Sequence, residues 1–136
     1  MAVDLGSRRV GIAVSDPTGT IAQPLSTVPA EPAETLVERL AELAGEQEAT
    51  MLVVGLPRRL DGGQGPEAKA ARALAGDLRR ASGLPVELVD ERMTSVAAER
   101  ALLAGGASRA RRRALSDQVA AALILQSYLD APRRRT

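Results

Sequence analysis

The first fourteen residues place the strongest constraint on the fold. Residues 2–5 form a short apolar run that carries one carboxylate, Asp4, and residues 9–14 form a second run rich in β-branched residues. Gly6-Ser7 separates the two runs, and this pattern predicts a β-hairpin. A charge among core-bound neighbours costs several kcal/mol unless it is paired. Asp4 therefore either caps the strand by bonding amides of the Gly6-Ser7 turn or binds a metal ion or phosphate-bearing ligand.

The absence of two residue types narrows the chemistry further. The 136 residues contain no Cys, which excludes disulfides and thiolate chemistry, and no His, which excludes Ser-His-Asp triads and most zinc sites. Tyr128 is the single aromatic residue, so aromatic stacking on bases is not a main binding device. Carboxylates remain as the usual charged catalytic groups, and they favour hard cations such as magnesium or manganese.

Length, hydropathy and charge indicate where the chain works and what it contacts. A chain of 136 residues predicts a single domain over residues 1–136. No run approaches the roughly 20 apolar residues of a membrane span, and the start lacks a signal-peptide pattern, so we expect a cytoplasmic protein without a membrane partner. Residues 107–136 hold seven Arg against two Asp. Such a region suits nucleic acid, and a solvated tail suits it equally well.

Hydrophobic periodicity predicts the order of the elements. Residues 16–19 predict a turn and residues 20–28 a third strand, in which Pro24 indicates an edge position or a bulge. The run over 51–54 is typical of a strand buried on both faces. The remaining expected elements are a helix ending near residue 45, a polar loop over 58–66, a helix ending at Ser82-Gly83, a strand over 85–89, a helix over 96–103, a basic loop over 108–113 and a helix over 116–129. This order predicts an α/β fold: a mixed five-stranded sheet (three-strand antiparallel meander plus two parallel strands) with helices on both faces.

Acidic residues fall at the predicted ends of these elements. Asp4 lies near the end of the first strand, Asp90 and Glu91 lie at the end of the fifth, and Asp117 lies at the expected start of the last helix. Ligands of open α/β sheets bind beyond the carboxyl ends of parallel strands, so these acids are expected to converge. Converging carboxylates repel one another unless a cation lies between them. Two cations about 3.5–4 Å apart would suit in-line attack on a phosphodiester.

Each acid also has a purely structural interpretation. Asp117 would cap the last helix, and its position alone does not separate this role from a catalytic one. Glu91 would form a surface ion pair with Arg92 or Arg100, and Asp90 would cap the strand end. The coincidence of three acids at three predicted ends favours the functional interpretation.

Four stretches of the chain resemble one known family. They are residues 4–15 (Asp-Leu-Gly-Ser-Arg-Arg-Val-Gly-Ile-Ala-Val-Ser), 53–57 (Val-Val-Gly-Leu-Pro) with Asp61-Gly62, 90–95 (Asp-Glu-Arg-Met-Thr-Ser) and 116–121 (Ser-Asp-Gln-Val-Ala-Ala). In this order they are similar to the YqgF family, also called RuvX-like, of pre-16S rRNA nucleases related to RuvC-type Holliday junction resolvases. With the intervening segments, the resemblance covers nearly the whole chain.

The resemblance implies an RNase H-like fold and metal-dependent phosphodiester hydrolysis. The implied role is trimming of the 5′ end of the 16S rRNA precursor in ribosome biogenesis, with junction cleavage as a related activity. The implied partners are pre-rRNA, the ribosomal particle and branched DNA. Carried over residue by residue, Asp4, Glu91 and Asp117 are the catalytic acids and would hold Mg²⁺ or Mn²⁺. Asp90 is expected to point to the opposite face from Glu91 because side chains alternate along a strand.

Arginines near these motifs are candidates for phosphate contacts, although a solubilising role suits each of them as well. They are Arg8, Arg9, Arg58, Arg59, Arg92 and Arg111. Two alternative functions remain open. One is a nucleic-acid-binding module of the same fold that does not cut. The other is a fragment of an actin-like or sugar-kinase-like ATPase, because residues 4–7 followed by Gly11 also resemble a phosphate-binding hairpin, although such folds need two domains.

Overall fold

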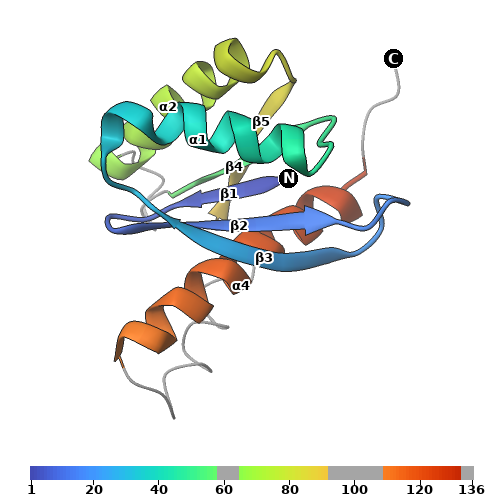
Figure 1. The fold of residues 1–136 in the computed structure, drawn as a ribbon. Helices are drawn as coiled ribbons and strands as arrows, with labels where there is room; N and C mark the ends of the chain where they lie inside the picture. The colour runs from blue at the N-terminus through green and yellow to red at the C-terminus, as the bar shows by residue number, and fades with distance from the viewer. Residues whose placement is uncertain (58–64, 92–108, 133–136) are drawn as a thin grey trace.

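The computed structural model describes residues 1–57, 65–91 and 109–132. Its centre is a five-stranded sheet with the strand order β3-β2-β1-β4-β5 (Figure 1). The strands are β1 (Ala2–Leu5), β2 (Arg9–Ser15), β3 (Ala22–Pro29), β4 (Leu52–Leu56) and β5 (Val86–Asp90). Strands β1, β2 and β3 pair antiparallel, whereas β4 is parallel to both β1 and β5. The predicted mixed sheet, an antiparallel meander plus two parallel strands, is confirmed.

Helices cover both faces of this sheet, as the order of elements predicted. Helices α1 (Ala33–Glu46) and α2 (Pro66–Ser82) lie on one face, and α4 (Arg109–Asp130) crosses the other (Figure 1). Because side chains alternate along a strand, each face has its own buried cluster. The cluster on the α1 and α2 side includes Val3, Val10, Ile12, Leu52, Val54, Leu40 and Leu78. The cluster under α4 consists mainly of smaller residues: Ala2, Ala13, Val53, Ala120, Ala121, Ile124 and Leu125.

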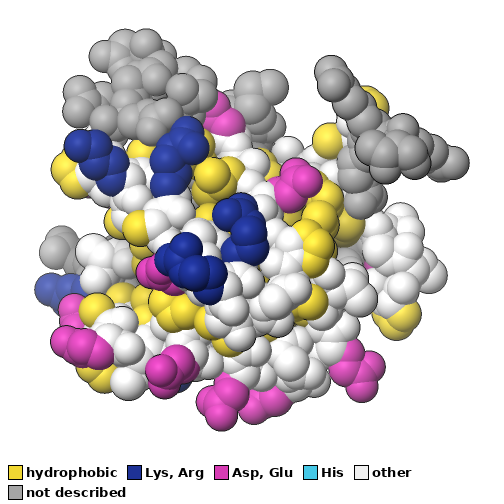
Figure 2. Space-filling view, turned by 90° about the horizontal axis from the view of Figure 1, so that it is seen from above, with side chains coloured by type: hydrophobic (Ala, Val, Ile, Leu, Met, Phe, Trp, Pro, Cys, Tyr) yellow, Lys and Arg dark blue, Asp and Glu magenta, His cyan; other side chains and the backbone are white. Residues whose placement is uncertain are grey.

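Charged side chains are distributed unevenly over the face formed by α1 and α2. Figure 2 looks onto α1 and α2, where basic side chains lie over the middle and toward one side, and acidic side chains gather mainly along one edge. The acidic residues of α1 are Glu34, Glu38, Glu42 and Glu46. The acids predicted to form a functional site belong to the other face or to the strand ends. Among the described residues, no helix combines the length and apolar character needed to cross a membrane.

The predicted turn after β2 is present and is closed by a carboxylate. Asp16 Oδ1 accepts hydrogen bonds from the amides of Thr20 at 2.8 Å and Ile21 at 3.0 Å, and Thr18 Oγ1 donates to Asp16 Oδ2 at 2.5 Å. The Ile21 amide first, and then the Thr18 hydroxyl and the Thr20 amide, lower the pKa of Asp16 to about 2. Strand β3 then runs along the edge of the sheet, with a register shift opposite Ile12 and Ala13 near Pro24. Both the edge position and the irregularity agree with the prediction from Pro24.

Two of the helices follow the sequence signals closely. Helix α1 begins after Pro32 and ends at Glu46, close to the expected end near residue 45. Helix α2 begins at Pro66, which suits a first helical position, and ends at Ser82. Gly83 caps it with a φ of 71°, the left-handed conformation that glycine adopts easily. The helix expected over 96–103 and most of the loop expected over 58–66 lie outside the described residues.

The start of the last helix was predicted wrongly. We expected a basic loop over 108–113 and a helix from about Ser116, but α4 already begins at Arg109. Residues 109–115 are all Ala, Arg or Leu, which are strong helix formers, and no Gly or Pro interrupts them. Asp117 therefore lies about two turns inside α4. A residue there neither caps the helix nor feels the full positive end of its dipole, so both of those interpretations of Asp117 fail.

Candidate functional site

Asp4 lies near the carboxyl end of β1 and is the only charged residue among those described that is buried, with 5% of its surface exposed. Its partner across the antiparallel ladder is Gly11 on β2. The turn that follows is closed by its own backbone, since the Gly6 amide donates to the Arg9 carbonyl oxygen at 2.9 Å. The Gly6 amide therefore has an acceptor within the turn and does not need the Asp4 carboxylate for one.

Gly55 on β4 shows that Asp4 and Glu91 share one space. A Cβ atom on Gly55 would lie 3.1 Å from Glu91 Oε1, 3.6 Å from Asp4 Oδ1 and 2.6 Å from Ile124 Cδ1 of α4. The two carboxylate oxygens are therefore no farther apart than the sum of the first two distances. Glu91 directly follows β5, so the ends of three adjacent parallel strands meet here on the face that α4 covers.

Gly11 brings Asp117 to the same place. A Cβ atom on Gly11 would lie 2.5 Å from the carbonyl carbon of Asp117, closer still to its carbonyl oxygen, and 3.2 Å from the amide nitrogen of Gln118. The backbone of α4 therefore rests directly on β2 at this point. Because Gly11 is also the cross-strand neighbour of Asp4, the backbone of Asp117 lies close to Asp4.

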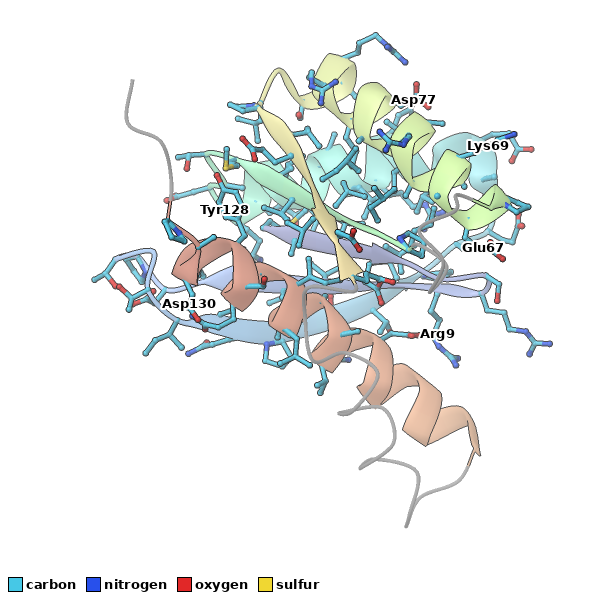
Figure 3. All side chains as sticks on the ribbon, turned by 180° about the vertical axis from the view of Figure 1, so that it is seen from behind. Arg9, Glu67, Lys69, Asp77, Tyr128 and Asp130 are labelled. Atoms are coloured by element: carbon cyan, nitrogen blue, oxygen red, sulfur yellow. The ribbon has the colours of Figure 1, made fainter. Side chains whose placement is uncertain are left out.

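The carboxylate of Asp117 is paired with an arginine in this structure. Arg9 Nε lies 3.5 Å from Asp117 Oδ2, and both side chains are partly exposed, at 24% and 15%. Figure 3 shows Arg9 on the α4 side of the sheet, whereas Tyr128 lies near the other end of that helix. Within residues 1–57, 65–91 and 109–132, no three potential metal ligands are grouped closely enough to hold an ion. The fold thus brings Asp4 and Glu91 together. It places Asp117 next to them, where the carboxylate of Asp117 forms an ion pair with Arg9.

Asp90 does not belong to this group. It is in register with Leu56, whose side chain is buried in the cluster under α1 and α2. Cross-strand partners point to the same face, so Asp90 lies on the side away from α4. The expectation that Asp90 and Glu91 point to opposite faces is consistent with this register.

The predicted arginines can be followed only in part. Arg8 is exposed in the hairpin turn next to Arg9. Arg58, Arg59 and Arg92 lie outside the described residues, and Arg111 lies on α4 with a side chain that is not described. Our sequence reasoning assigned no positioning role to Gly11 and Gly55. A glycine inside a strand pattern is a signal for close approach of backbone, so both positions carried a usable signal.

A cavity of about 520 Å³ lies at the opposite end of the sheet from these acids. It is bordered by the start of β1, the turn at Asp16, the loop before β4 and the end of α4 near Tyr128. It contains none of Asp4, Glu91 and Asp117. The candidate site is therefore the group formed by Asp4, Glu91 and Asp117, and not this cavity.

Comparison with known proteins identifies the family. The sequence model of the RuvX family, described as a Holliday junction resolvase, matches residues 1–131. A Pelotomaculum thermopropionicum protein named "Putative pre-16S rRNA nuclease" is 50% identical over 98% of this chain and 90% of its own length. A Myxococcus xanthus protein of the same name is 48% identical over 98% of this chain and 88% of its own length.

Solved structures support the fold. The T. thermophilus RuvC in complex with a Holliday junction substrate matches with a TM-score of 0.56 and 18% identity, over 93% of this chain and 90% of that chain. This likeness shows an RNase H-like fold, as the sequence resemblance implied. The family match over nearly the whole length and the identities near one half agree with it. The chain therefore belongs to the RuvX family of nucleases.

Proposed function

We propose that this nuclease depends on a divalent metal ion, and that Asp4, Glu91 and Asp117 form its active site. The observation that carries the proposal is the position of Asp4, a buried carboxylate whose oxygen shares one space with that of Glu91. Burying a carboxylate costs free energy, and buried ionisable groups are therefore concentrated at functional sites. Asp117 begins next to this pair, on the helix that rests on Gly11.

The donor set fits magnesium or manganese. The three side chains offer only oxygen ligands, and the chain has no His or Cys that would favour zinc or another soft metal. Asp117 completes the set when its carboxylate turns from Arg9 toward Asp4. A bound ion supplies an activated water molecule and neutralises charge on the scissile phosphate.

The protein contributes rigidity and shape to this site. Asp4 lies on a central strand with a neighbour on each side, so its backbone is held in place. Gly55 leaves room between Asp4 and Glu91, and Gly11 lets α4 approach the sheet. Sites built on strands and helices hold their groups more precisely than sites on loops. Arg9 adds the positive charge that a phosphate backbone needs.

The proposed substrate is the 5′ end of the 16S rRNA precursor, alone or within a ribosomal particle in the cytoplasm. The names of the relatives at 44–50% identity support this choice. Cleavage of a four-way DNA junction is the second candidate, because the matching family model is described as a Holliday junction resolvase.

Cleavage assays with a matched pair of variants test the proposal. Asp4→Asn removes one charge from the site, and Asp77→Asn removes one charge from α2 on the other face of the sheet. Each protein is incubated with a labelled RNA that spans the 5′ end of 16S rRNA, and with a labelled four-way junction, in Mg²⁺, Mn²⁺ or EDTA. We expect the wild type and Asp77→Asn to cut only in metal, and Asp4→Asn to cut at least about a hundredfold more slowly.

Each other outcome points to a different function. Equal cutting by wild type and Asp4→Asn would mean that another nuclease contaminates the sample or that the site lies elsewhere. Binding without cutting in both metals would favour a non-catalytic nucleic-acid-binding module. ATP hydrolysis without strand cleavage would favour the ATPase alternative.

A further inference from the structure

Arg9 has an unusual environment for a partly exposed arginine. Its Nε and Nη2 atoms are buried, and neither has a hydrogen-bond partner. Nε faces Asp117 Oδ2 at 3.5 Å, which is an ion pair but too long for a good hydrogen bond. A guanidinium has five donors in a rigid fork, and buried donors that stay unpaired are destabilising. Asp117 therefore leaves both of these Arg9 donors without a hydrogen bond.

From this environment we propose that Arg9 couples metal binding to nucleic-acid binding. Arg9 places its positive charge beside Asp117, where a bound cation would also lie. If Asp117 held a divalent ion, Arg9 would lose this partner, and its guanidinium would be available to contact a phosphate of the nucleic acid. This inference rests on the proposed metal site and adds to it a positioning role for one side chain.

The location of Arg9 favours this role over a surface ion pair. Arg9 and Gly11 are two residues apart on β2 and so point to the same face, and Gly11 contacts both Asp4 across the ladder and Asp117 through α4. Arg9 thus lies at the border of the group formed by Asp4, Glu91 and Asp117. A planar guanidinium matches two phosphate oxygens, which a single carboxylate oxygen at 3.5 Å does not satisfy.

The coupling has a thermodynamic consequence that can be measured. If one ligand raises the affinity of the protein for a second ligand by some factor, the second ligand raises the affinity for the first by the same factor. If Arg9 competes with the metal for Asp117, its removal strengthens metal binding in the absence of nucleic acid. If released Arg9 binds phosphate, its removal weakens nucleic-acid binding only when metal is present.

Three variants separate this proposal from a general effect of charge. Arg9→Gln removes the charge and the fork, whereas Arg9→Lys keeps the charge without the fork. Arg80→Gln is the control, because it removes one positive charge from the exposed end of α2, where Arg80 pairs with Asp77. Thermal unfolding first establishes that all three variants are folded. Mn²⁺ affinity is measured by calorimetry without nucleic acid. RNA affinity is measured by fluorescence anisotropy, with a phosphorothioate RNA that resists cleavage, in Mn²⁺ and in EDTA.

We expect Arg9→Gln to bind Mn²⁺ about fivefold more tightly than the wild type, the size of effect that a partly exposed ion pair has. In Mn²⁺ its RNA affinity should fall about tenfold, whereas in EDTA it should change less than about threefold. Arg9→Lys should restore the Mn²⁺ affinity of the wild type but only part of the RNA affinity. Arg80→Gln should leave both affinities within about twofold of the wild type.

Two results would overturn the coupling. One is an Arg9→Gln protein whose Mn²⁺ affinity equals that of Arg80→Gln. The other is an equal loss of RNA affinity in Mn²⁺ and in EDTA, which would make Arg9 an ordinary phosphate contact. Asp4→Asn separates this failure from a failure of the metal site. If Asp4→Asn abolishes Mn²⁺ binding while Arg9→Gln behaves like the control, only the role of Arg9 is wrong. If Asp4→Asn leaves Mn²⁺ binding intact, the metal site itself is wrong.

Discussion

Replacing Gly11 with alanine should dislodge the helix that carries Asp117. The new Cβ atom would lie 2.5 Å from the carbonyl carbon of Asp117, whereas unbonded carbon atoms normally lie about 3.5–4.0 Å apart. The obstacle is helix backbone in the interior of α4, which cannot turn away as the end of a side chain can. Helix α4 must therefore retreat from β2 by about 1 Å or more.

The size of the effect follows from what this retreat disturbs. Ala120, Ala121 and Ile124 are fully buried against the sheet on the same helix, so a shift loosens their packing as well. Overpacking a core typically costs about 1–3 kcal/mol, and the rigid obstacle here places Gly11→Ala at the upper end of that range. Alanine restricts the unfolded chain and returns about 0.4–1 kcal/mol. The net loss in the free energy of unfolding should be about 2 kcal/mol.

Urea denaturation followed by circular dichroism at 222 nm measures this loss. With a typical slope of about 1–3 kcal/mol per molar urea, the midpoint should fall by about 1 M. Gly45→Ala is the matched control, because Gly45 is exposed on α1 and a Cβ there meets no atom within 4 Å. It should raise the free energy of unfolding by about 0.5–1 kcal/mol, since alanine favours a helix over glycine.

A Gly11→Ala protein that unfolds at the wild-type urea concentration would refute the reasoning. It would mean that α4 does not rest on β2 at Asp117, and the placement of the third acid would lose its basis. The same protein assayed for cleavage gives a second check. If stability falls as expected, cleavage measured well below the unfolding midpoint should also fall, because Asp117 moves away from Asp4.

Two further variants probe neighbouring features. Gly55→Ala would place a Cβ 2.6 Å from the flexible end of Ile124 and 3.1 Å from Glu91 Oε1, so we expect a stability loss of only about 1 kcal/mol but at least about a tenfold loss of cleavage. If Gly55→Ala and a folded core variant such as Leu78→Ala lost cleavage activity to a similar extent, the space between Asp4 and Glu91 would have no special role. Asp16→Asn tests the turn after β2. The pKa of Asp16 is about 2 in the folded protein and 3.8 in the unfolded reference. The charge of Asp16 therefore stabilises the folded protein above pH 3.8, and this stabilisation is lost as the pH falls toward 2. The difference in unfolding midpoint between wild type and Asp16→Asn should thus be constant near neutral pH and shrink between pH 4 and 2; a difference that does not depend on pH in this range would show that the charge has no part in it.

Most of the fold was predictable because local signals and burial agree. The apolar run before Gly55, the Gly6-Ser7 turn between two strand-like runs and the glycine after α2 each favour one structure. Strands with those patterns pair in few ways, which gave the mixed sheet of an antiparallel meander plus two parallel strands. Pro24 likewise indicated the edge strand, since proline removes a backbone donor and is tolerated there.

The candidate site was predictable in part. The strand ends indicated that Asp4 and Glu91 would meet, and the register places Asp90 on the other face. The start of α4 was misjudged because consecutive arginines were read as a loop, although arginine is a good helix former. The pairing of Arg9 with Asp117 depends on the close contact at Gly11, which joins residues far apart in the sequence. No local pattern specifies which of two adjacent arginines faces the helix.

The edge formed by β3 bears on the behaviour of the chain at high concentration. An unprotected edge strand offers free backbone groups to a strand of another molecule and so promotes aggregation. Here Pro24 removes one donor, Pro29 at the end of the strand removes another, and the register shift opposite Ile12 and Ala13 interrupts the regular spacing. The outer strand is thus a poor template for intermolecular pairing, even though Leu25 within it and Ile21 just before it are exposed.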